Sequence, residues 1–236
     1  MIKKIYYIIG WEQFANDAVQ ARTAAWTSSA AKHNLEFCFY GLRSPILREN
    51  NYKNIYIRIV ITLVNAIFML VRCCFSKFEK DAIVIISSPP FFSAFCAGFI
   101  LNIRRISFSV EVRDPYPRTF FDVGLISEQS LFTKYLQKME RFLYSKAKNI
   151  IVTDLFDKLP ELSEFSGKIY HCLNGINKED IHQLNDLPFL QKLKRNKELG
   201  LINIVSLGRI GMMQDRKRLI VEINEALNSD KIGSVI

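Results

Sequence analysis

Short strand-like runs alternate with longer helical patterns along most of this sequence, and this alternation constrains the fold more than any other feature. Several of the runs are almost continuously apolar, which is typical of parallel strands covered by helices on both faces. The clearest helix is predicted over Ser130–Lys146, where apolar side chains recur at helical spacing. The pattern predicts an α/β fold with a doubly wound, Rossmann-like parallel sheet, whose ligand site lies at the carboxyl ends of the strands. The candidate strands are Lys4–Ile9, Leu35–Tyr40, Ala82–Ile86, Ser107–Val112, Asn149–Thr153 and Lys168–Cys172.

The composition of the chain becomes polar and Lys-rich after residue 175, which predicts two domains of unequal size. At roughly 100–200 residues per domain, 236 residues hold one complete domain and part of another. Residues 1–175 are expected to form the Rossmann-like domain, and the polar, Lys-rich residues 176–200 a linker with at most a short helix. Residues 201–236 read as the β-α-β start of a second Rossmann-like domain, which we expect to be incomplete because such a piece cannot bury its own faces. Its predicted elements are a strand at Ile202–Leu207, a helix at Asp215–Asn228 and a strand from Gly233 to Ile236.

Composition and spacing exclude several classes of protein. With 49% hydrophobic and 23% charged residues, the chain has the balance of a globular protein. Its five cysteines show no Cys-x-x-Cys spacing and its three histidines are scattered, so we expect no metal site and no cofactor. The amino-terminal residues lack a secretory cleavage pattern, which predicts a reducing, cytoplasmic location. The glycine patterns of dinucleotide-binding and P-loop proteins are absent, which disfavours a dehydrogenase or an NTPase.

The net charge of +9 is concentrated in two zones. Residues 41–80 carry seven basic and two acidic side chains, and residues 191–218 carry eight and two. Such zones suggest anionic partners, either membrane lipid or phosphate groups, and an ordinary solvated face is the alternative. No helix-turn-helix, RNP or zinc-finger pattern occurs, so we do not expect nucleic acid as a partner.

An uncharged apolar run covers Ile59–Val71, between Arg58 and Arg72. Thirteen residues of helix reach about 20 Å, short of the roughly 30 Å hydrocarbon core of a bilayer, so the run is not predicted to span a membrane. One interpretation is a helix that covers the sheet and turns a polar stripe outward. The other is an interfacial helix whose apolar surface dips into lipid, helped by its basic flanks. The stripe consists of Arg58, Thr62, Asn65, Arg72 and Ser76.

Two loops at strand ends hold the residues best suited to chemistry. The third strand ends in Ser-Ser-Pro-Pro, where Ser88 and the prolines can open a helix whose amino end favours phosphate or sugar hydroxyls. The fourth strand ends in Glu111 and continues into Arg113 and Asp114, before two prolines that stiffen the loop. Asp114 can orient a hydroxyl and Arg113 can bind a phosphate. The alternative is an Asp–Arg pair that only fixes a turn.

Several segments, in this order, resemble one family of enzymes. They are IVIISSPPFFSAFCAGFI, FSVEVRDPYPRTFFDVGL, ERFLYSKAKNIIVTD, YHCLNGINKEDI and IVSLGRIGMMQDRKRLIVEINEA. Together they resemble bacterial two-domain (GT-B) glycosyltransferases of the large retaining family 4, and most of all the subgroup that builds surface polysaccharides and capsules. The fourth segment is similar to the family's domain boundary and the fifth to the start of its nucleotide-binding domain. The resemblance covers nearly the whole chain.

The resemblance implies roles for residues of the amino-terminal domain. Arg113 and Asp114 match the reaction-centre loop, where the family often has His-Asp, and are the implied catalytic residues. The implied acceptor-binding residues are Gly10, Ser88 and Glu111. Gly10 and the tryptophan after it are what this chain retains of the family's glycine-rich first loop.

The resemblance also implies a donor site in the second domain. Arg209 matches the family's basic residue for the donor diphosphate, and Gln214 stands where many members have a lysine. The family's donor site further uses a pair of glutamates that would fall after Ile236. The chain by itself is therefore expected to be inactive, and no metal ion is implied.

The predicted function is transfer of a sugar from a nucleotide-sugar donor to a lipid-linked or polysaccharide acceptor, at the cytoplasmic face of the bacterial inner membrane. The expected association with the membrane surface is peripheral. Two alternatives stay open: a non-catalytic subunit that binds the acceptor or the membrane and meets a separate donor-domain partner, and a truncated, inactive product.

Overall fold

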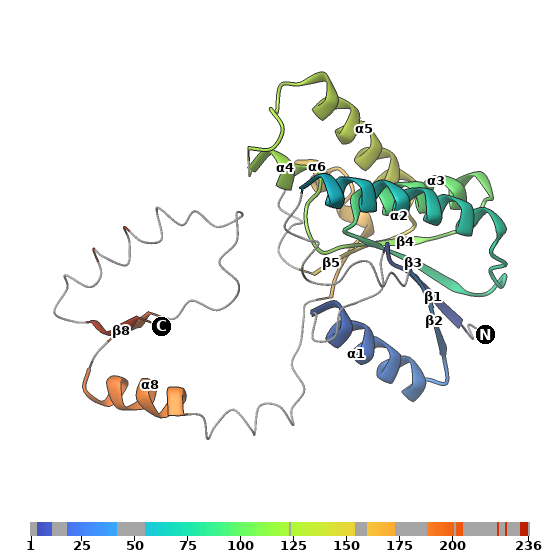
Figure 1. The fold of residues 1–236 in the computed structure, drawn as a ribbon. Coiled ribbons are helices and arrows are strands. Elements are labelled where there is room, and N and C mark those ends of the chain that lie inside the picture. Colours follow the sequence, from blue (N-terminus) through green and yellow to red (C-terminus); the bar gives the residue numbers. More distant parts are fainter. Residues whose placement is uncertain are drawn as a thin grey trace. The chain divides into compact units, whose positions relative to one another are not determined.

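The protein is described by a computed structural model (Figure 1). The residues that the structure describes are 4–10, 18–41, 55–122, 124–153, 160–172, 188–200, 202–204, 221, 225 and 232–235. The chain divides into two compact units, Met1–Asn174 and Gly175–Ile236, and each is considered by itself.

The first unit is built on a six-stranded sheet in which every strand pairs in parallel with its neighbours. The predicted parallel α/β class is confirmed, and each strand lies within two residues of its predicted bounds. The order in the sheet is β2-β1-β3-β4-β5-β6, so the chain first builds to one side of β1 and then to the other. The strands are β1 Lys4–Ile8, β2 Glu36–Tyr40, β3 Ile83–Ser88, β4 Ser109–Val112, β5 Ile150–Val152 and β6 Ile169–His171.

Helices cover both faces of this sheet (Figure 1). Helix α1 lies on one face, and α2, α3 and α5 lie on the other. Their close packing is clearest at Gly98 of α3, where an added Cβ would lie 2.4 Å from Cδ1 of Leu143 on α5. The helices are α1 Ala18–Lys32, α2 Ile55–Phe75, α3 Phe91–Ile103, α4 Arg118–Asp122, α5 Leu131–Lys146 and α6 Pro160–Ser163, with a 3-10 turn, η4, at Ser166–Lys168.

The core follows from the two-residue period of the strands. In β1, Tyr6 and Ile8 point into the larger cluster beneath α2, α3 and α5, whereas Tyr7 belongs to the cluster on the α1 side with Trp26. Because both faces are covered, consecutive strand residues are buried, which explains the continuous apolar runs in the sequence.

Helix α2 turns its polar side toward the protein, which is the reverse of the predicted outer stripe. Asn65 is fully buried, and Thr62, Arg72 and Ser76 are partly buried; the side chain of Arg58 lies outside the described residues. The Arg72 guanidinium lies 4.6 Å from the Tyr40 ring centre and donates to the Gly41 carbonyl oxygen at 3.2 Å. The interpretation with an outward polar stripe is wrong because Thr62, Asn65 and Arg72 lie on the side of α2 that is turned toward the protein. Within the described residues, no helix has the length and apolar character needed to cross a membrane.

Helix α5 begins as predicted and carries a buried carboxyl group. Its amino end is capped by Ser130, whose hydroxyl accepts a hydrogen bond from the Thr133 amide at 3.1 Å. Glu140 is buried beside Tyr144. Burial raises the pKa of Glu140 to about 8, against a smaller opposing effect of a hydrogen bond with Tyr144, while the Glu161 charge raises it further.

We expect Glu140→Gln to remove part of the pH dependence of stability. Because the native-state pKa of about 8 lies above the ordinary 4.5, the native state binds more protons than the unfolded state between these values, and stability falls as pH rises through that window. At about 1.4 kcal/mol per pH unit, Glu140 should lower the free energy of unfolding by about 2 kcal/mol from pH 6 to pH 8. Urea denaturation at both pH values should show a smaller fall for Glu140→Gln than for the unaltered chain. The matched control, exposed Glu164→Gln, should keep the original fall; equal falls in both variants would contradict the assignment.

The second unit contains α8 Pro188–Glu198 and a two-stranded parallel sheet of β7 Ile202–Ile204 and β8 Ile232–Val235. Helix α8 occupies part of the stretch predicted as a linker and contacts β7. Of the predicted helix between the strands, the structure describes residues 221 and 225, and both are helical.

Candidate functional site

The strand order places a candidate site between β1 and β3. These neighbouring strands are where the chain switches from one side of the sheet to the other, and ligands of open α/β sheets bind at such a switch point, outside the carboxyl ends of the strands. Gly10 follows the end of β1, Ser88 ends β3, and Ser88 is level with Val112 at the end of β4. The topology therefore brings the predicted residues of three separate loops to one edge.

Gly10 allows the end of β1 to approach the start of α3 closely. A Cβ at this position would lie 2.6 Å from two ring carbons of Pro90 and 2.9 Å from Oγ of Ser93. A proline ring cannot swing aside, so a larger residue at position 10 would push apart the two loops that flank the switch point. Gly10 thus shapes the site through its lack of a side chain.

The amino end of α3 has unused hydrogen-bonding groups. Its N-cap residue, Pro90, supplies no side-chain cap, and the first helical hydrogen bond runs from the Ala94 amide to the Pro90 carbonyl oxygen at 3.0 Å. The amides before Ala94 are thus not needed inside the helix. The Ser93 hydroxyl, in the first turn, is buried and has no hydrogen-bond partner among the described residues. Backbone amides and a hydroxyl at a helix amino end suit an anion or a sugar hydroxyl.

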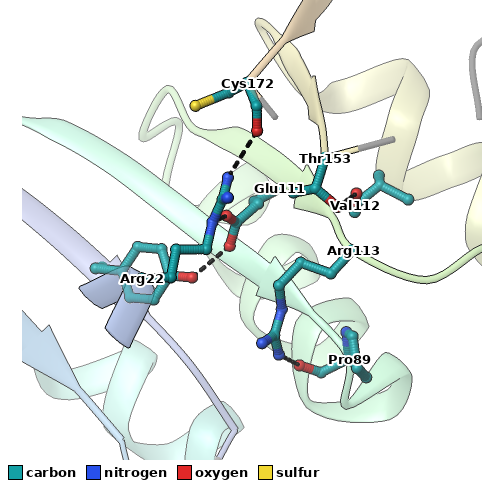
Figure 2. Close-up of polar contacts among 8 residues, drawn as sticks. Arg22, Pro89, Glu111, Val112, Arg113, Thr153 and Cys172 are labelled. Carbon is teal, nitrogen blue, oxygen red and sulfur yellow. Dashed lines mark hydrogen bonds and ion pairs between the residues drawn. The ribbon is translucent and has the colours of Figure 1, made fainter. Parts of the chain in front are cut away.

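Arg113 is held against this helix start by the loop that precedes it. Its backbone amide donates to the Ser88 carbonyl oxygen at 2.9 Å, and its Nη2 donates to the Pro89 carbonyl oxygen at 3.0 Å. Figure 2 shows the side chain reaching from β4 to Pro89. The Nε atom is buried and has no partner among the described residues. Arg113 therefore places a positive charge, with one donor unused, beside the loop that opens α3.

Asp114 is the exposed member of the predicted catalytic pair. Surrounding protein atoms remove part of its hydration and raise the pKa of its carboxyl, while the positive charge of Arg113 lowers it. Within the described residues the two side chains form no ion pair, and Arg113 instead binds the Pro89 carbonyl oxygen. The alternative of an Asp–Arg pair that fixes the turn therefore finds no support in these contacts. The role of Asp114 in catalysis stays a prediction.

Glu111 is the centre of a buried ionic network. It has no exposed surface; its Oε1 accepts from Nε of Arg22 at 2.5 Å, and its Oε2 accepts from the Tyr7 hydroxyl. Nη2 of Arg22 also donates to the Cys172 carbonyl oxygen at 3.1 Å, so the arginine joins α1, β4 and the end of β6 (Figure 2). Burial and then the nearby carboxylate raise the pKa of Tyr7, which keeps its hydroxyl a donor. Because both oxygens of Glu111 already have protein partners, its predicted contact with an acceptor stays a prediction.

Three residues of the site were not identified from the sequence: Tyr7, Arg22 and Ser93. Arg22 carried a signal, since it is the only charged residue of α1 before Lys32. An arginine that such a helix buries against a sheet calls for an acidic partner, because charged side chains are almost never buried unless they are paired. Nothing in the sequence indicated which acid, because Glu111 lies 89 positions further along the chain.

The remaining predicted residues are only partly covered by the structure. Ser88 is buried, and its carbonyl oxygen accepts a hydrogen bond from the Arg113 amide. Arg209 and Gln214, predicted to bind the donor phosphates, lie outside the described residues. In the part of the chain that the structure describes, no three His, Cys, Asp or Glu side chains come together as a metal site would require.

No protein-family model and no curated protein matches this sequence. Several solved structures are similar to it, and two of these share 10% sequence identity with it. One is the complex between a UDP-glucosyltransferase from Polygonum tinctorium capable of glucosylating indoxyl and 3,4-dichloroaniline, with a TM-score of 0.46 over 89% of this chain and 60% of that chain. The other is LpCGTa in complex with UDP, with a TM-score of 0.44 over 100% of this chain and 75% of that chain. The chain thus spans 60% of the length of the first, and similarity at this level assigns no function to it.

Proposed function

We propose that this chain is the acceptor-side part of a glycosyltransferase that moves a sugar from a nucleotide-sugar to a lipid-linked or polysaccharide acceptor in bacterial surface polysaccharide synthesis. It acts at the cytoplasmic face of the inner membrane, with peripheral attachment. The sequence resemblance to GT-B enzymes of family 4 supports the reaction class, and the site at the switch point supports the acceptor side.

One observation is central to the proposal. Beside the loop that opens α3, Ser93 Oγ and Arg113 Nε are buried polar atoms without partners among the described residues. Buried polar atoms normally have partners, and those that lack one in a folded protein call for an explanation. A bound phosphate or hydroxyl that accepts from both would supply it, and the exposed carboxyl of Asp114 follows directly in the chain.

In the proposed reaction each group has a distinct task. The amides at the start of α3, Ser93 and Arg113 hold the anionic part of the acceptor, and Asp114 accepts a hydrogen bond from the acceptor hydroxyl that attacks the sugar. The new bond forms between that oxygen and the anomeric carbon as the bond to the nucleoside diphosphate breaks, and the hydroxyl proton passes to the Asp114 carboxylate. In the donor half, the positive charge of Arg209 and hydrogen bonds from the neutral amide of Gln214 are the proposed contacts that stabilise the departing diphosphate. No metal ion is part of this proposal.

The test is binding of a polyprenyl-diphosphate sugar to the full chain, measured by titration calorimetry. We expect Arg113→Gln to weaken binding about 10- to 100-fold, because a hydrogen bond to a charged group is worth about 1.5–3 kcal/mol. The matched control is Arg141→Gln, an exposed arginine paired with Glu164 at 2.7 Å, which should bind as the unaltered chain does. Equal affinities of the two variants, at unchanged melting temperatures, would remove Arg113 from the site.

A non-catalytic subunit that binds the acceptor or the membrane is the second candidate. It is favoured by the exposed apolar side of α2, which suits attachment whether or not the chain catalyses transfer. Combining the chain with a separately supplied donor domain distinguishes the two candidates: transfer that needs Asp114 supports the enzyme, and binding without any transfer supports the subunit.

A further inference from the structure

From residue 59 onward, where the structure describes its side chains, the side of α2 that faces away from the sheet is apolar. At 3.6 residues per turn its members fall on one side of the helix, over almost its whole length. They include Ile67, with 64% of its surface exposed, and Phe75, with 83%. This α2 apolar face consists of Ile59, Val60, Leu63, Val64, Ile67, Leu70, Val71, Cys74 and Phe75.

The polar residues of α2 are on the opposite side, although the interior is the less favourable place for them. Both amide atoms of Asn65 are buried and have no hydrogen-bond partner among the described residues. A helix on a water-exposed surface shows the reverse pattern, with apolar residues toward the core. The exposed apolar side and the buried polar side of α2 therefore indicate that the outer face of this helix contacts an apolar surface when the protein acts.

The face is bordered by positive charge where α2 and α3 end. Nη1 of Arg104 donates to the carbonyl oxygens of Cys73 and Ser76, which joins the carboxyl ends of the two helices. Exposed Phe99 and Ile103 of α3 add apolar surface near this end. The exposed cations here are Lys77, Lys80, Arg104 and Arg105; of the two acids nearby, Glu79 pairs with Lys4 at 2.7 Å and Asp81 is exposed.

We infer that the α2 apolar face is the surface by which this protein docks on an anionic lipid bilayer. From Ile59 to Phe75 the helix is about 24 Å long at 1.5 Å per residue, and it lies along the bilayer with its outer side chains among the acyl chains. The cations at its carboxyl end bind lipid phosphates. A second copy of the face would supply no counter-charge, because neither α2 nor α3 contains an acidic residue. The inference deepens the peripheral attachment in the proposed function and rests on it for the identity of the membrane.

The experiment is flotation of the full chain with vesicles of phosphatidylcholine, with and without phosphatidylglycerol, in the absence of any sugar. The chain should float with the anionic vesicles. The double variant Ile67→Ser, Phe75→Ser should reduce binding more than tenfold, given about 1.5–3 kcal/mol for each large apolar side chain buried. Lys77→Gln should reduce vesicle binding about fivefold, since each basic residue near the membrane surface contributes about 1 kcal/mol. Added salt should also weaken binding, because it screens the attraction between these cations and the lipid phosphates. The matched control is Leu199→Ser, an exposed leucine of the second unit, which should bind normally.

A second double variant, Leu63→Ser with Val64→Ser, guards against a local folding defect at the end of the helix, and all variants should keep the circular dichroism of the unaltered chain. Equal flotation of every variant would overturn the inference. So would a dimer in lipid-free buffer that Ile67→Ser, Phe75→Ser dissociates without affecting flotation, because the face would then be a contact between copies. Since no donor or acceptor is present, failure here leaves the proposed transfer reaction untouched, and failure of the transfer assay leaves the docking surface untouched.

Discussion

Replacing Glu111 by alanine is expected to lower the free energy of unfolding by about 3–5 kcal/mol, the cost of breaking a buried ion pair by removing one partner. The carboxylate has no exposed surface, and the side chain of Arg22 is only 9% exposed. Removing the acid takes the Glu111 carboxylate away from a buried guanidinium, which keeps its hydrogen bond to the Cys172 carbonyl oxygen at 3.1 Å, and deprives the Tyr7 hydroxyl of its acceptor. Urea denaturation followed by circular dichroism measures the loss.

Two further variants separate the ionic network from a general effect of losing a glutamate. Glu36→Ala breaks an exposed pair with Lys4 on neighbouring strands, at 3.2 Å, and should cost much less than Glu111→Ala, because solvent screens an exposed ion pair. Replacing both buried partners, Glu111→Leu with Arg22→Met, should recover much of the stability, because neither member of this ion pair then remains buried without the other. If Glu111→Ala cost no more than Glu36→Ala, the network would be of little energetic importance.

Asp114→Asn is expected to reduce kcat by about 10²–10⁴-fold in an enzyme that has a complete donor half, as for other residues that position or accept a proton. The substitution keeps the size of the side chain and removes its charge. Because Asp114 is exposed and has no ion pair with Arg113 among the described residues, the melting temperature should change little. Single-turnover kinetics and a thermal melt measure the two effects separately.

The pH profile gives an independent readout of the same residue. Asp114 can accept a hydrogen bond from the acceptor only when ionised, and partial desolvation raises its pKa above the ordinary 3.8. Activity should therefore rise with pH through that raised pKa, and the rise should be absent in Asp114→Asn. A variant with unchanged turnover and a lower melting temperature would show that Asp114 supports the loop and does not act on the substrate.

Much of the first unit follows from local sequence alone. Continuous apolar runs such as Ala82–Ile86 predict strands covered on both sides, since alternating polar residues would have no water to face. Apolar side chains at helical spacing predict α5 from Ser130, and the structure shows that this serine caps the helix. The candidate loops after β3 and β4 were predictable for a similar reason, as parallel strands end at one common edge.

Only the tertiary structure decided which distant groups meet and which medium each helix face touches. Arg22 and Glu111 are 89 residues apart, and nothing local to either identifies the other, because their pairing depends on the packing of α1 against the sheet. The periodicity of α2 likewise separated a polar side from an apolar side without showing which one faces the core. Asn65 lies inside and Ile67 outside because the side of α2 that meets the sheet and α3 is set by how the whole layer packs, and amphipathic spacing is the same in either orientation.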